Sequence, residues 1–153
     1  MAKDVNLQLA AAASPITTTT ALAAKDTEGG FYALVRLYIG TITDADETMT
    51  LTVEASIDGG TDYRQICVFP NFVATDDNFE IARCCYVPRP QGPPDTGAVQ
   101  TVTKVRLKAS AIAGTTPSFP ITAFLEPLVS LAVPGGEDNR SETLNKGVAA
   151  LRA

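Results

Sequence analysis

A strict alternation of polar and apolar residues between positions 48 and 57 constrains the fold of this chain more than any other feature. The apolar positions of this run are Met49, Leu51, Val53, Ala55 and Ile57, and threonine, glutamate or serine fills each position between them. Successive side chains of an extended strand point to opposite faces, so a period of two predicts a strand with one buried and one wet face.

A turn sequence follows this strand immediately. Asp58-Gly59-Gly60-Thr61 separates it from a second extended candidate, Asp62 to Phe69. Glycine adopts positive φ angles without steric cost, and short Asp-Gly loops are typical of β-hairpins. The two segments are therefore predicted to pair as antiparallel neighbours.

Other segments have the same strand-like composition. Phe31 to Ile42 is apolar on both faces apart from Arg36, which indicates either a central strand covered on both sides or a strand at an interface. The remaining candidates are Asn78 to Val87, Val99 to Ala109, Phe119 to Val133 with Pro127 inside it, and the weaker segments Val5 to Ala11 and Ile16 to Leu22. The sequence predicts an all-β chain of about eight strands, folded as an antiparallel β-sandwich or jelly roll.

The 153 residues suffice for one domain with a single core. Residues 1–24 are expected to form an N-terminal arm with the first weak strands, residues 25–134 the sandwich, and residues 135–153 a polar linker and a C-terminal arm. In this last part, Leu144, Val148 and Leu151 share one side of a short predicted helix. Such a helix is marginal alone, so we expect both arms, Met1 to Ala13 and Asp138 to Ala153, to contact neighbouring subunits.

Charge and composition limit the partners. The net charge of −5 gives no basic surface for phosphates, so nucleic acid is not expected as a partner. No apolar run approaches the roughly 20 residues of a membrane-spanning helix, and the N-terminus lacks the apolar core of a signal peptide. Synthesis in a cytoplasm without membrane association is therefore expected. The chain has three cysteines, Cys67, Cys84 and Cys85, and this odd number favours reduced thiols over a disulfide framework. The adjacent thiols of Cys84 and Cys85 are expected on opposite faces of a strand.

The sequence lacks the usual signatures of a catalytic site. The chain has no histidine, which removes the commonest general base and metal ligand, and it has neither of the common glycine-rich phosphate loops. Glycoside hydrolysis requires two carboxylates that face each other across the sugar, and nothing in the sequence places Glu54 or Glu80 opposite another acid. The acidic turn around Asp44, Asp46 and Glu47 fits solvated carboxylates better than a calcium loop. We expect no catalytic residue, no cofactor and no metal site.

One concentrated positive feature remains. Lys104, Arg106 and Lys108 share one face of their predicted strand, about 7 Å apart. This stripe is a candidate binding site for an acidic partner surface. The alternative is a solvated face that discourages aggregation at a sheet edge.

The overall organisation resembles that of a known class of proteins. An Ala/Thr-rich segment (Leu9 to Ala24) precedes a sandwich containing the hairpin TLTVEASIDGGTDYRQI (Thr50 to Ile66), and a polar tail follows. In this arrangement the chain resembles small virion proteins of tailed bacteriophages, and most of all capsid decoration, or cement, proteins.

The resemblance implies a non-enzymatic subunit on the outer capsid surface, bound to the major capsid protein or to other virion subunits. It also implies a homo-oligomer, either a trimer or a dimer. Two alternatives stay open: a neck, tail-tube or fibre-base protein of the same particle, and a cellular carbohydrate-binding or adhesion sandwich that would use Tyr32, Tyr38, Tyr63 and Tyr86.

Overall fold

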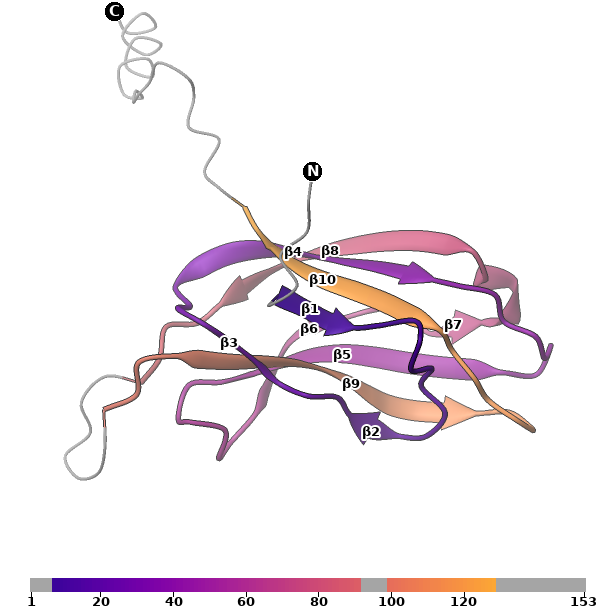
Figure 1. Ribbon diagram of the computed structural model, residues 1–153, viewed down its shortest axis with the longest axis horizontal. Coiled ribbons are helices and arrows are strands. Elements are labelled where there is room, and N and C mark those ends of the chain that lie inside the picture. The colour runs from indigo at the N-terminus through magenta and orange to yellow at the C-terminus, as the bar shows by residue number, and fades with distance from the viewer. Residues whose placement is uncertain (1–6, 92–98, 129–153) are drawn as a thin grey trace, which may run out of the picture.

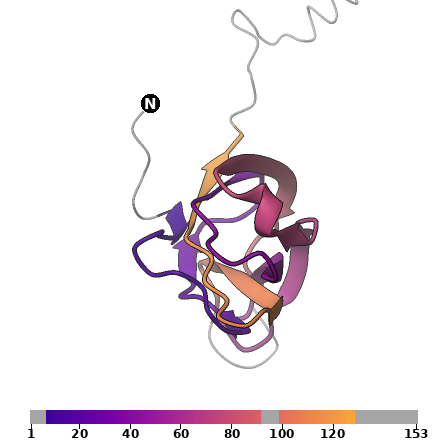
Figure 2. The same cartoon turned by 90° about the vertical axis from the view of Figure 1, so that its right-hand side faces the viewer.

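A computed structural model describes residues 7–91 and 99–128 of the protein. These residues form two antiparallel sheets. The strands are β1 (Gln8–Ala10), β2 (Thr20–Ala21), β3 (Lys25–Thr27), β4 (Phe31–Ile39), β5 (Thr48–Ser56), β6 (Arg64–Val68), β7 (Phe72–Val73), β8 (Phe79–Val87), β9 (Thr103–Ala113) and β10 (Ile121–Pro127), with a 3-10 turn η2 (Ala74–Asp76). One sheet has the order β1-β10-β4-β8; the other has the order β2-β9-β5-β6, with β3 beside β9 and β7 beside β5. The sheets face each other (Figures 1 and 2), which confirms the predicted all-β sandwich.

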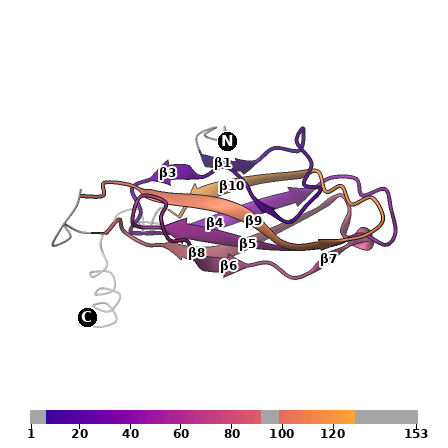
Figure 3. The same ribbon diagram turned by 90° about the horizontal axis from the view of Figure 1, so that it is seen from below.

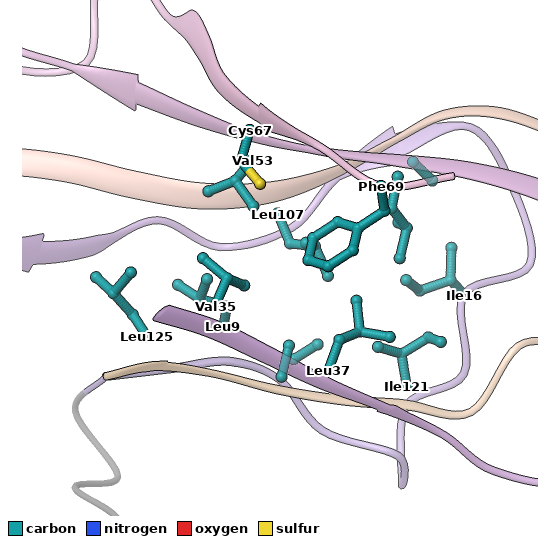
Figure 4. Packing of buried hydrophobic residues seen from close by; sticks show 14 of the residues in the cluster. Leu9, Ile16, Val35, Leu37, Val53, Cys67, Phe69, Leu107, Ile121 and Leu125 are labelled. Carbon is teal, nitrogen blue, oxygen red and sulfur yellow. The ribbon is translucent and has the colours of Figure 1, made fainter. Parts of the chain in front are cut away.

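The core fills the space between the two layers. Figure 4 shows side chains of the four-stranded sheet, such as Leu37 and Leu125, pointing toward Val53 and Leu107 of the other sheet. All four are at most 1% exposed, and they belong to one continuous apolar cluster. Burial of such side chains is the main favourable contribution to folding.

Strand β5 confirms the predicted burial of its apolar face but corrects the prediction that its polar face is wet. Its apolar positions are buried, yet Thr52 and Ser56 on the opposite face are also only 5% and 1% exposed. Thr52 lies in register between Lys108 of β9 and Val68 of β6, so neighbouring strands flank it on both sides. Figure 3 shows β9 and β5 side by side at the centre of this sheet. The expected wet face is therefore partly dry, because β5 is a central strand.

The Asp58–Thr61 turn joins β5 to β6, as predicted. Gly59 and Gly60 have φ angles of +80° and +98°, which residues with a Cβ rarely adopt. One oxygen of the Asp58 carboxylate accepts hydrogen bonds from the Ser56 hydroxyl (2.6 Å) and from the backbone N–H groups of Thr61 (3.1 Å) and Asp62 (3.0 Å). The carboxylate thus holds the turn in place.

These hydrogen bonds predict a measurable titration. The backbone N–H of Asp62, followed by the Ser56 hydroxyl, lowers the pKa of Asp58 below its ordinary value. In Ser56→Ala we expect this pKa to rise part of the way back, because the Asp62 donor remains. A lowered folded-state pKa adds stability that is present above the unfolded-state pKa and is lost as pH falls through the folded-state pKa. NMR titration of the Asp58 side chain in both proteins measures the shift, and an ordinary pKa in the unaltered protein would contradict this account.

The N-terminal segment differs from the expected arm. Strand β1 pairs with β10, strand β2 pairs with β9, and Leu9 and Ile16 are 3% and 2% exposed. From Leu7 onward this segment forms part of the sandwich, because its few apolar residues pack into the core of its own chain. Strands β2 and β3, on either side of the expected boundary at residue 24, both pair with β9. The predicted C-terminal arm, with Leu144, Val148 and Leu151, lies outside the described residues.

Strand β8 is the longest strand at a sheet edge. All nine of its residues pair with β4, and no described strand pairs with its other side. Cys85 and Val87 are buried, so by alternation Arg83 is on the same, core-facing side; it is nevertheless exposed. Burial raises the pKa of the Cys67 thiol on β6, and the positive charge of Arg83 offsets part of this rise. A cation therefore lies where the sandwich opens between β6 and β8.

Candidate functional site

The outer face of the four-stranded sheet exposes more large apolar side chains than a solvated face needs. On β4 the residues with odd numbers from 33 to 39 are buried in the core, so the even-numbered ones point outward. The same alternation places outward residues on β8, where Cys85 and Val87 are buried, and on β10, where Ile121, Ala123 and Leu125 are buried. We call this surface the tyrosine face; its members are Tyr32, Leu34, Arg36, Tyr38, Glu80, Ala82, Cys84, Tyr86, Thr122, Phe124, Glu126 and Leu128.

Exposure is concentrated on three tyrosines of this face. Tyr32 is 65% exposed, Tyr38 46% and Tyr86 44%. Tyr32 and Tyr86 are register partners, and their ring centroids lie 5.0 Å apart with the planes at 62°. This edge-to-face contact holds both rings in position, so they present apolar area with little conformational freedom left to lose.

An ion triad crosses the centre of the tyrosine face. Arg36 on β4 donates from Nε to Glu126 on β10 (3.3 Å to Oε2) and from a terminal nitrogen to Glu80 on β8 (3.2 Å). The hydrogen bonds to Glu126 and then to Glu80 raise the pKa of Arg36. The Arg36 side chain is about a third exposed, so it is held by its own sheet and is still accessible from outside.

The lysine and arginine stripe lies on the opposite outer face, on β9. Lys104 bonds Asp26 (2.8 Å), which raises the pKa of Lys104. Arg106 bonds Glu54 (2.8 Å) and lies 3.6 Å from the centre of the Tyr63 ring. Lys108 is 3.4 Å from the other oxygen of the same glutamate.

Every cation of the stripe therefore has a carboxylate partner within the chain. This geometry accounts for the stripe without an external acidic surface. Binding of a partner by Lys104, Arg106 and Lys108 stays a prediction.

The glutamate under the stripe gives a test of this account. The Glu54 side chain is only 12% exposed and neutralises two cations, so Glu54→Gln should lower the free energy of unfolding by about 1 kcal/mol, between the values for exposed and buried charged hydrogen bonds. Urea denaturation measures it. The matched control is Asp26→Asn, which removes a more exposed partner of the stripe and should leave the denaturation midpoint nearly unchanged. Equal effects of the two would mean that burial of Glu54 does not matter.

The acidic turn before β5 binds another loop of the chain. Asp46 accepts from the backbone N–H (3.0 Å) and hydroxyl (2.7 Å) of Thr115, which lowers the pKa of Asp46, the hydroxyl having the larger effect. Asp44 accepts from the Thr116 hydroxyl. Glu47, fully buried, accepts from the backbone N–H groups of Asp44 (3.2 Å) and Ser118. We call these three acids and the turn they bind the carboxylate clamp.

Glycine at position 114 allows this close approach. Gly114 has a φ of +133°, and an added Cβ there would lie 3.0 Å from the Cα of Glu47. The clamp joins the β4–β5 and β9–β10 connections, about 70 residues apart in sequence.

The acids weighed for sugar hydrolysis are not arranged for it. Glu54 lies on the outer face of the six-stranded sheet and Glu80 on the outer face of the other sheet, so the core separates them. Glu80 and Glu126 share the tyrosine face, but both bind Arg36. In residues 7–91 and 99–128 no group of three or more His, Cys, Asp or Glu side chains could hold a metal ion.

A recess of about 570 Å³ opens near the β5–β6 turn. Its lining is mainly aliphatic, including Ala55, Ile57, Ile66 and Pro88, with Asp58, Asp62 and Arg64 among its polar residues. The Asp58 oxygen described above already accepts three hydrogen bonds from its own turn. The recess thus offers mainly apolar contact.

The three cysteines differ in environment as expected for the adjacent pair. Cys84 is exposed on the tyrosine face, while Cys85 and Cys67 are buried, and all three are free thiols. Burial raises the pKa of Cys85 to about 11. Cys85 is therefore a packed core residue without nucleophilic character at neutral pH.

Comparison with known proteins assigns no family to the chain. Neither the known protein families nor the curated proteins contain a match to the sequence. Within the part of the chain that the structure describes, no helix has the length and apolar character needed to cross a bilayer.

The sequence indicated Tyr32, Tyr38 and Tyr86 only as residues that a sugar-binding module would use, and it did not place them together on one sheet face. The sequence feature that pointed to the tyrosine face is the apolar character of Phe31 to Ile42 on both sides of the strand, for which an interface was one of two interpretations. Two of its other contributors, Tyr86 and Leu128, lie on strands or strand ends whose pairing with β4 no local pattern reveals.

Proposed function

We propose that this chain is a non-enzymatic structural subunit of a virus particle, which decorates and cements the capsid by bridging neighbouring subunits. The tyrosine face carries the binding part of this proposal. Exposed tyrosines around a fixed arginine are the composition that protein interfaces favour at their centres. The virion part rests on the resemblance in organisation to phage decoration proteins, with the major capsid protein or other virion subunits as partners and a homo-oligomer as the working form.

The alternatives use the same surface differently. A neck, tail-tube or fibre-base protein would also bind through an apolar sheet face, and it differs only in its place on the particle. A carbohydrate-binding module needs aromatic rings that lie flat against a sugar. The 62° angle between Tyr32 and Tyr86 prevents both rings from stacking on one flat ligand, which favours a protein partner.

The decisive experiment is a mass-spectrometric inventory of virus particles purified from cells that carry the gene. We expect the chain in many copies per particle, and labelled antibodies should bind the outside of intact capsids. Labelling confined to the neck or tail would favour the alternative position. Absence of the chain from all such particles would contradict the virion proposal.

The tyrosine face can be tested separately. Tyr32→Ser combined with Tyr86→Ser should weaken binding to particles that lack the protein by at least about tenfold, as expected for residues at the centre of an interface. Val68→Ser is the matched control, because Val68 is equally exposed (47%) but lies on the other sheet. Co-sedimentation measures binding, and thermal melting verifies that all variants fold. Equal loss in the control would contradict a role specific to this face.

A further inference from the structure

The tyrosine face exposes several large hydrophobic side chains to solvent. Of the nine large hydrophobic side chains that are exposed among the described residues, four belong to it: Tyr32, Tyr38, Tyr86 and Leu128. Apolar surface of this kind is normally covered by a partner or by another part of the chain. The question is what covers it before any partner arrives.

The chain leaves the sandwich at one corner of this face. The backbone N–H of Leu128 donates to the carbonyl of Tyr32 (2.9 Å), so the last described residue lies beside the most exposed tyrosine. Residues 129–153 follow, with Pro134-Gly135-Gly136 as a break six residues later. Six extended residues span about 20 Å, and such a break permits the chain to reverse direction.

The dimensions of the segment after the break match those of the face. A helix over residues 139–153 would be about 22 Å long, so it would fit along a strand of nine residues such as β4, which is about 30 Å long. In that helix Leu144, Val148 and Leu151 would form one apolar side. The segment therefore has the length and the apolar side needed to lie along the sheet.

Charge favours the same arrangement. Residues 139–153 contain three basic residues and one acidic residue, a net charge of +2. Residues 129–138 contain two acids, so residues 129–153 sum to zero and the rest of the chain carries the whole net charge of −5. On the face itself, Glu80 and Glu126 outnumber Arg36. A basic segment next to an acidic domain is attracted to it, and the short link between them gives an effective concentration in the millimolar range.

We infer that residues 139–153 bind the tyrosine face of their own chain. From its sequence this segment was expected on a neighbouring subunit; the structure offers a nearer apolar surface. This inference does not require the virion assignment, and its failure leaves that assignment standing.

The exposed thiol of Cys84 provides a reporter on the face. Cys84 lies opposite Leu34 on the adjacent strand, while Cys67 and Cys85 are buried. The rate of its reaction with Ellman's reagent should rise about tenfold in the full chain carrying Leu144→Ser, Val148→Ser and Leu151→Ser. This value corresponds to a dissociation constant of about 0.1 mM between the segment and the tyrosine face, at an effective concentration of the segment of about 1 mM. A control with Ala149→Ser and Ala153→Ser, on the opposite side of the same helix, should leave the rate unchanged.

Four outcomes are informative. Reaction of one thiol per chain in every variant verifies that the sandwich stays folded. A faster reaction in the triple variant, with a rate in the unaltered protein that does not depend on protein concentration, supports binding within one chain. A rate that falls as concentration rises would make a second copy the occupant and overturn the inference, as would equal rates in the triple variant and its control.

Discussion

Replacing Leu107 with aspartate should prevent the chain from folding to a soluble form. Leu107 on β9 is completely buried between the two sheets. Removing such a leucine costs about 2–5 kcal/mol, and a carboxyl group without a partner in the core adds its desolvation. Together these terms approach the whole net stability of a domain, about 5–15 kcal/mol. Leu51→Asp on β5 should behave in the same way, because Leu51 is equally buried.

The measurement is the soluble yield after expression, followed by circular dichroism. Ala111→Asp is the matched control, since Ala111 lies on the same strand and is exposed. Thr52→Asp, an obvious choice from the alternation alone, is not a suitable control, because Thr52 is buried between its neighbours. Normal folding of Leu107→Asp would contradict the assigned register of β9.

The second largest effect is expected at the carboxylate clamp. Glu47→Ala leaves the half-buried backbone N–H groups of Asp44 and Ser118 without the acceptor that the buried Glu47 carboxylate supplies. A buried donor without a partner costs about 1–3 kcal/mol, so the expected loss of unfolding free energy is about 2–5 kcal/mol. Glu47→Gln should lose less, because the amide oxygen still accepts one of the two hydrogen bonds.

Urea denaturation of the three proteins measures this series. Asp46→Ala is the control from the same turn: its carboxylate also binds the Thr115 loop, but at an exposed position. We expect a clearly smaller shift of the midpoint there. If Asp46→Ala were as damaging as Glu47→Ala, the clamp would act through its surface hydrogen bonds and not through the buried acid.

Residue patterns predicted the parts of the fold that local sequence determines. The alternation before the Asp58 turn located β5, and the turn itself located its hairpin partner β6. Strand β9 was predicted at residues 99–109 but begins at Thr103 and continues to Ala113. The apolar residues Val99 and Val102 resemble the start of a strand, although they precede the first pair with β3.

Long-range contacts could not be read in this way. Strands β3 and β7 have three and two residues, too few for a period, and they exist because β9 and β5 offer them a free edge. The carboxylate clamp joins segments about 70 residues apart, so its acids looked like solvated turn residues. The tyrosine face depends on which strands flank β4, and only the fold shows this.

The guanidinium of Arg83 on the open edge of β8 has a bearing on the colloidal behaviour of the protein. From Ile81 to Val87 it is the single charge in a run of seven residues that contains neither proline nor glycine. Uncharged runs of this length and composition can stack into cross-β fibrils when an edge is free. Arg83 thus acts as a gatekeeper. In concentrated stocks, turbidity on storage should depend on this one residue, while the folded state itself needs it little.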